Sequence, residues 1–240
     1  MDNFVFSKNN YDGLCYIQAV EKYYSNMEIK YNNHVLRGQE RESFVKQMHD
    51  NITENEQLMT YINSVEISTT ARVNPNNTLR RIEIILRDII FIRNECMMNQ
   101  ILFLQSDTDY LKKHTREWLM VSINEAFKNV YGFDKKKASL WRKDVKDIMS
   151  LSYLNEMKNE YDAITDKLEQ LSKQHDWYKP ERCDKVHMNI GNLLNDRQEP
   201  INESKVMIAS VPVLEVLEFV QDFVTRIHKK CIDKRLMRML

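Results

Sequence analysis

Hydrophobic residues recur every three or four positions along most of this chain, with polar residues between them. Apolar side chains at that spacing fall on one face of an α-helix. The pattern predicts helices over residues 11–26, 41–63, 79–98, 110–130, 135–148, 154–175 and 210–231. We therefore expect a mainly α fold, built as a helical bundle.

Two short segments in the first third of the chain alternate apolar and polar residues instead, which is the period of a β-strand. Residues 27–36 contain an Asn-Asn pair that tolerates left-handed backbone, so they predict a small β-hairpin. Residues 64–69 predict a lone strand. The Asn-Pro turn at 74–75 then predicts a boundary between an irregular N-terminal region, 1–75, and a helical bundle, 76–240.

The arrangement of apolar residues in two of the predicted helices indicates how these helices pack. The helix over 79–98 is apolar on nearly every side, which is typical of a helix with several neighbours. The helix over 154–175 has apolar residues three and four apart, the spacing of a heptad seam that lies along another helix. These residues are Leu154, Met157, Tyr161, Ile164, Leu168 and Leu171. Three heptads are the minimum for a coiled coil between chains, so packing within the bundle is favoured.

Local signals mark where several helices begin and end. Residues 106–109 offer short side chains that cap the helix over 110–130, and Gly132 follows as its terminating residue. Ser210 is the expected cap of the last helix, with Pro212 in the first turn, where a missing N–H costs little. Apolar residues from Leu214 to Cys231 give this helix a second apolar stripe.

Composition excludes several classes of protein. The chain of 240 residues holds only 4 Gly and 4 Pro, where average usage gives about 17 and about 12. A glycine-rich phosphate loop needs glycines close together, and an all-β fold needs frequent Gly/Pro turns. The scarcity of both residues therefore excludes these two classes. Lys and Arg number 35 and Asp and Glu also 35, so no global positive field exists to hold a nucleic acid.

The sequence lacks the common motifs that bind a metal or a cofactor. None of the six histidines lies in H-E-x-x-H or even E-x-x-H, so the helical di-iron pattern is absent. The four cysteines, Cys15, Cys96, Cys183 and Cys231, show no C-x-x-C spacing and indicate free thiols in a reducing compartment. The first residues do not read as a signal peptide, and no apolar run is long enough to cross a bilayer. We expect a cytoplasmic protein with no cofactor, no metal and no membrane contact.

One short segment, residues 179–189, carries candidate chemistry. Arg182 and His187 form an R-x4-H motif between the heptad helix and the last amphipathic helix. Arg binds a phosphate through two parallel hydrogen bonds, and His transfers protons near neutral pH. The motif and its position resemble those of the HEPN superfamily of helical-bundle ribonucleases, in particular the abortive-infection type. The resemblance covers at best residues 135–230.

The resemblance implies a homodimer that pairs two such motifs across its interface and cleaves RNA without a metal. Arg182 and His187 would then be catalytic, with Asp184 and Asn189 supporting them. Lys179 and Lys185 are the candidate phosphate contacts. The family prefers Asn, Asp or His directly after the Arg, and this chain has a cysteine there, with Asp184 one position later.

The sequence leaves two main functions open, besides that of a structural or accessory protein of the phage type. The first is a metal-independent endoribonuclease of a defence or toxin–antitoxin system, acting on RNA as a homodimer. The alternative is a non-catalytic interaction module (an antitoxin, adaptor or regulatory subunit) that binds a protein partner through the seam 154–171 or the stripe 214–231. Trp118, Trp141 and Trp177 fall in helical seams and are expected to anchor the core rather than stack on bases.

Overall fold

Every regular element in the described part of the chain is helical. The structure is a computed structural model and describes residues 18, 21–22, 38–69, 78–132, 139–174 and 203–237. The α-helices are α2 (Gln39–Thr69), α3 (Thr78–Gln105), α4 (Asp109–Val130), α5 (Lys146–Met149), α6 (Lys158–Gln174) and α9 (Glu203–Met237). A π-helical segment, η2 (Leu140–Val145), precedes α5, and a 3₁₀ segment, η3 (Ser152–Met157), precedes α6. The predicted helical bundle is confirmed, and the predicted hairpin at 27–36 lies outside the described residues.

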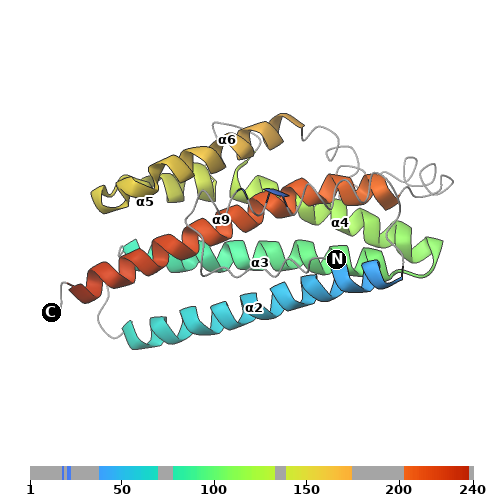
Figure 1. Cartoon of the computed structure of the whole chain (residues 1–240), viewed down its shortest axis with the longest axis horizontal. Coiled ribbons are helices and arrows are strands. Elements are labelled where there is room, and N and C mark those ends of the chain that lie inside the picture. The colour runs from blue at the N-terminus through green and yellow to red at the C-terminus, as the bar shows by residue number, and fades with distance from the viewer. Residues whose placement is uncertain are drawn as a thin grey trace.

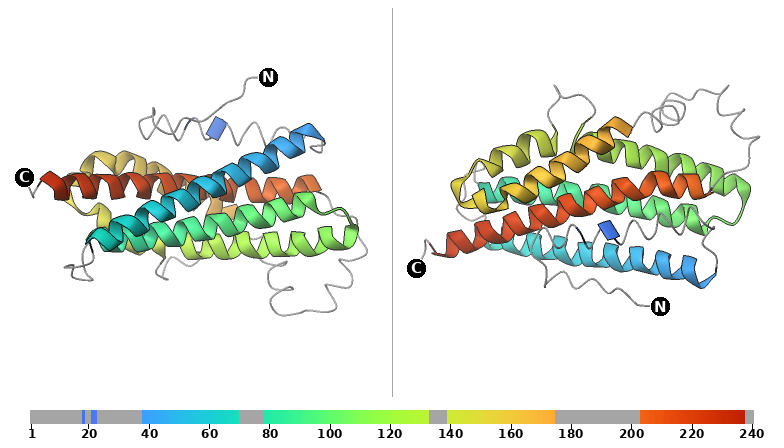
Figure 2. Two further views of the ribbon diagram at one scale, coloured as in Figure 1. Left: turned by 90° about the horizontal axis from the view of Figure 1, so that it is seen from below. Right: turned by 45° about the horizontal axis from the view of Figure 1, so that its top comes forward.

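Helix α3 is the central helix of the bundle (Figure 1). Helices α2, α4 and α9 each pack against it, and α6 packs on α9. Two further views show α2, α3 and α4 side by side (Figure 2, left) and α6 lying along α9 (Figure 2, right). The apolar pattern of residues 79–98 had indicated several neighbours, and α2, α4, α9 and the π-helical segment η2 do contact α3.

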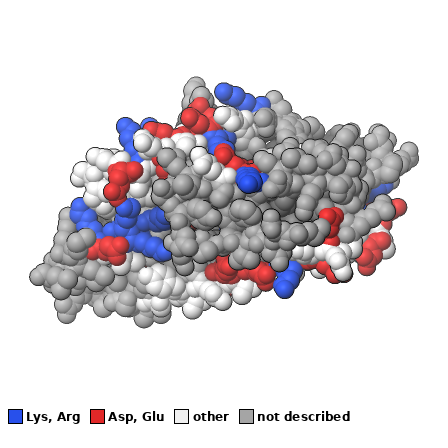
Figure 3. Space-filling view, in the orientation of Figure 1, with Lys and Arg blue, Asp and Glu red and all other residues white. Residues whose placement is uncertain are grey.

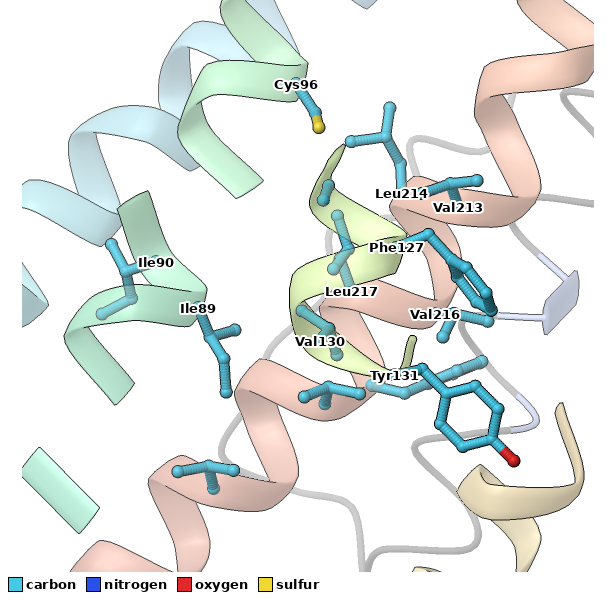
Figure 4. Close-up of a cluster of buried hydrophobic side chains, with 14 of the residues drawn as sticks. Ile89, Ile90, Cys96, Phe127, Val130, Tyr131, Val213, Leu214, Val216 and Leu217 are labelled. Carbon is cyan, nitrogen blue, oxygen red and sulfur yellow. The ribbon is translucent and has the colours of Figure 1, made fainter. Parts of the chain in front are cut away.

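The core is continuous from α2 to α9. Side chains from α3, α4 and α9 meet in its middle (Figure 4). At one end, Trp141 of η2 is fully buried and stacks on Tyr161 of α6, with ring centroids 5.0 Å apart. Phe223 of α9 completes this group, 5.6 Å from Trp141. The expectation that Trp141 anchors the core is therefore confirmed.

A layer of polar side chains crosses this apolar core. Arg93 of α3 is 1% exposed, and it donates to Glu218 Oε2 (2.9 Å) and to Gln221 Oε1 (3.1 Å), both on α9. Gln221 Nε2 donates to Asn55 Oδ1 of α2 at 2.6 Å, and Asn55 Nδ2 donates to Asn94 Oδ1 at 2.6 Å. Buried polar groups are stable only when paired, so this polar layer fixes α2, α3 and α9 relative to one another.

The ends of α4 follow the sequence signals. The Thr108 hydroxyl accepts a hydrogen bond from the Leu111 N–H (3.2 Å), which satisfies one of the unpaired donors at the start of the helix. Gly132 has φ 81°, and its N–H bonds to the Phe127 carbonyl at 3.1 Å. A side chain at that left-handed φ is disfavoured, which explains why glycine ends this helix.

The heptad seam packs inside the molecule, as predicted. Five of its six apolar residues are buried, and Tyr161 is partly buried. The seam begins in η3 and continues through α6, which packs on α9. The buried residues are Leu154, Met157, Ile164, Leu168 and Leu171.

The predicted strand at 64–69 is wrong, because α2 continues as a helix to Thr69. The β-branched residues there follow Ile62, which is fully buried among the other helices. Tertiary packing of a long helix outweighs the weak β preference of such residues, which is worth less than about 1 kcal/mol each.

The predicted start of the last helix at Ser210 is also wrong. Helix α9 begins at Glu203, and Pro212 lies inside it. Val206 and Met207 are buried, so the first two turns already contribute to the core. The Ser210 hydroxyl, instead of capping the helix, accepts a hydrogen bond from Gln100 of α3 at 2.8 Å. These contacts offset the backbone hydrogen bond that Pro212 removes.

The predicted domain boundary near residue 75 falls between described segments. Helix α2, which precedes the boundary, packs on α3, which follows it, and places Val45, Met48 and Ile62 in the same core.

Replacing Arg93 by methionine tests the polar layer. The substitution leaves Glu218 and Gln221 without their buried donor, so we expect the free energy of unfolding to fall by about 3–5 kcal/mol. Lys230→Met is the matched control, because it removes an exposed pairing with Glu156 that is worth at most about 1 kcal/mol. Urea denaturation followed by circular dichroism measures both, and equal losses in the two variants would contradict the role given to Arg93.

Candidate functional site

The six residues that the sequence singles out for chemistry lie outside the described part of the chain. They fall in 175–202, so their predicted roles stay predictions. These residues are Lys179, Arg182, Asp184, Lys185, His187 and Asn189. The lysines at 135–137 and Trp177 also lie outside the described residues.

The structure does show how α9 is anchored where it begins. Glu203 is buried and forms ion pairs with Arg41 of α2 and with Lys112 of α4, the latter at 3.1 Å. Arg41 also donates to the Leu104 carbonyl at the end of α3 (3.1 Å). One carboxylate thus joins the ends of three other helices to α9.

A hollow of about 570 Å³ opens beside this anchor. Val45 and Leu104 form its apolar floor, and its charged lining includes two basic and two acidic side chains. The charged residues are Arg41, Lys46, Glu42 and Asp107. Because the charges are balanced, the hollow favours neither an anion nor a cation. On the face seen in Figure 3, basic and acidic side chains likewise lie close to one another.

The outstanding surface of the described molecule is one side of α3. Helices α2, α4 and α9 and the π-helical segment η2 contact α3, yet seven of its residues, spaced four and three apart from Ile84 to Gln105, are exposed and form one stripe. We call the first six residues of this stripe the open face of α3. It consists of Ile84, Asp88, Phe91, Glu95, Met98 and Leu102. Its four apolar side chains are exposed to solvent: Ile84 by 45%, Phe91 by 65%, Met98 by 39% and Leu102 by 47%.

Helix α4 extends this apolar surface. Thr115 Oγ1 lies 3.1 Å from the hydroxyl of the serine that follows α3, and Ser122 hydrogen-bonds Cys96 of α3. Trp118 is one helical turn from both Thr115 and Ser122, so it lies on the same edge of α4. The Trp118 side chain is 47% exposed. Leu111, seven residues earlier, is equally exposed. The prediction that Trp118 anchors the core is therefore wrong.

Helical periodicity alone does not reveal the open face. The sequence shows α3 as apolar all round, and such a helix is equally compatible with four covered sides. The distinguishing signal is the placement of Asp88 and Glu95 seven residues apart on one side, since carboxylates are rarely fully buried.

Two free thiols of the described residues, Cys96 and Cys231, are buried. Burial raises the pKa of the Cys96 thiol to about 12, and burial also raises the pKa of Cys231, which contacts the Tyr153 hydroxyl at 3.1 Å. Thiols protonated at neutral pH are poor nucleophiles, so neither thiol is activated. No group of His, Cys, Asp and Glu in the described segments has the arrangement of a metal site.

His228 of α9 is 1% exposed and faces Glu83 of α3, with Nε2 3.7 Å from Oε1. The ring of Tyr61 packs edge-on against His228, with centroids 6.4 Å apart. Burial lowers the pKa of His228, so the imidazole is neutral at pH 7. It belongs to the packed interior between α2, α3 and α9.

None of the helices in the described segments is long and apolar enough to span a bilayer. No family model matches the chain, and neither a curated protein nor a solved structure matches it.

The neutral state of His228 predicts how stability depends on pH. The pKa is lower in the folded protein than the value near 6.5 of the unfolded chain, so the unfolded state binds the proton more tightly. Stability is fully present above that value and falls as pH decreases through it toward the lower pKa of the folded state, by at most about 1.4 kcal/mol per pH unit.

Urea unfolding of the wild type and of His228→Gln at several pH values in this window checks this expectation. The variant is expected to show a shallower dependence on pH, whatever its absolute stability. An unchanged slope in the variant would show that another group causes the dependence.

Proposed function

We propose that this protein is a helical interaction module that binds a partner protein on the open face of α3. The observation that carries the proposal is the exposure of Ile84, Phe91, Met98 and Leu102 along one side of the central helix. Large apolar side chains that gather on one exposed face of a protein commonly mark a binding site, whereas single scattered ones do not.

The surroundings of the open face suit it to binding. Its helix is packed on three sides and linked by Arg93 to α9, so the face needs little ordering when a partner arrives. Aromatic side chains and methionine are enriched at the centres of interfaces, and Phe91, Met98 and Trp118 supply them here.

Photo-crosslinking in the native host tests this function. A benzoylphenylalanine placed at Phe91 or Met98 is expected to capture one identifiable partner protein, detected by mass spectrometry. The control position is Gln57, which is exposed on α2 on the side opposite the buried Asn55 and Ile62. The same adducts from all three positions, or none from the open face, would refute the proposal.

The sequence favours a second candidate function, the metal-independent ribonuclease. Its support is the R-x4-H motif at Arg182 and His187, which resembles that of the HEPN superfamily. The helices on either side of the motif were predicted from sequence, and both occur, as α6 and α9. In this function Arg182 binds the scissile phosphate, His187 transfers the proton, and two copies meet at a two-fold axis.

Incubation of the purified protein with RNA in the presence of a chelator tests the second candidate. Arg182→Ala and His187→Ala are each expected to reduce cleavage at least about a hundredfold, the usual contribution of a general acid–base group. Arg197→Ala and His175→Ala remove the same residue types outside the motif and should leave cleavage unchanged. Cleavage that survives both motif substitutions would exclude this function.

A further inference from the structure

The open face carries charge of one sign only. Asp88 and Glu95 lie between its apolar residues and are both exposed. The nearest arginines of α3 already interact with other residues. Arg81 forms ion pairs with Asp144 (3.7 Å) and Asp147 (3.5 Å). Arg87, which is partly buried beside the face, also interacts with another residue. A partner therefore meets a surface that is apolar and acidic.

Resting on the proposed function, we infer that the partner docks as an amphipathic helix with two basic side chains seven residues apart. The two carboxylates are seven residues apart on α3, about 10 Å along its axis. A helix laid along α3 places its own residues i and i+7 at the same separation. Apolar residues between these basic residues and on either side of them, at three- and four-residue spacing, would contact Ile84, Phe91 and Met98.

The cost of removing carboxylates from water supports basic partner residues. An apolar helix over the open face would bury Asp88 and Glu95 without counter-ions, which is unfavourable. Surrounding side chains already raise the pKa of the Asp88 carboxyl through partial burial. Lysine or arginine opposite each carboxylate offsets this cost and fixes the register of the docked helix.

A second copy of this chain fits the same face poorly. In a parallel arrangement Asp88 would face Asp88 and Glu95 would face Glu95 of the other copy. In an antiparallel arrangement centred near Arg93, each Asp88 would lie within one turn of the other copy's Glu95. Like charges at an interface are repelled, so both arrangements are disfavoured.

Matched peptides test the inference. Three fluorescein-labelled peptides of 22 residues carry leucine at three- and four-residue spacing and differ at two positions seven apart, which hold Lys, Gln or Glu. Fluorescence anisotropy measures their binding to the full chain at concentrations where each peptide is monomeric. We expect the Lys peptide to bind about tenfold more tightly than the Glu peptide, with the Gln peptide between them.

Charge reversal on the protein supplies the decisive comparison. Asp88→Lys/Glu95→Lys is expected to prefer the Glu peptide, whereas Asp50→Lys/Glu54→Lys, which makes the same charge change on exposed residues of α2, keeps the wild-type order. Circular dichroism confirms that both variants fold.

Other outcomes would contradict the basic-helix docking, the use of α3, or both. Equal affinity of the wild type for all three peptides overturns the basic-helix inference and leaves docking on α3 intact. Failure of every peptide to bind overturns both. Sedimentation that shows a dimer of the wild type, lost in Phe91→Ser, would assign the open face to a second copy and refute the inference.

Discussion

The buried guanidinium of Arg93 is the constraint on which the bundle depends. A cation that is 1% exposed needs its partners, and these are Glu218 and Gln221 of α9. Gln221 in turn donates a hydrogen bond to Asn55 of α2, which extends the polar layer to a third helix. Apolar side chains alone would tolerate small slips of one helix along another, whereas the hydrogen bonds of this polar layer form in a single register.

The open face follows from that register. Once α2 and α9 are fixed against α3 and α4 closes the third side, the orientation of the remaining side is determined. Phe91 is two residues before Arg93, about 160° away around the helix, so burying the arginine turns the phenylalanine outward. The interior and the proposed binding surface are therefore two consequences of one helix orientation.

Periodicity in the sequence was sufficient for most of the helices. It predicted the helix that ends at Gly132 and the seam from Leu154 to Leu171, because those features depend on local spacing and backbone conformation. It missed the first turns of α9, where the energy comes from contacts distant in sequence, such as Glu203 with Arg41. The exposed Trp118 was missed for a related reason, since spacing identifies a face but not whether another helix covers it.

The polar layer also has an evolutionary consequence. Its hydrogen bonds join residues up to 166 positions apart in the sequence, from Asn55 to Gln221. A single substitution at any of these positions strands the buried groups of its neighbours, so natural change there requires compensating changes on another helix. Homologues should consequently show linked substitutions at 55, 93, 218 and 221, while the open face varies in step with whatever protein it binds.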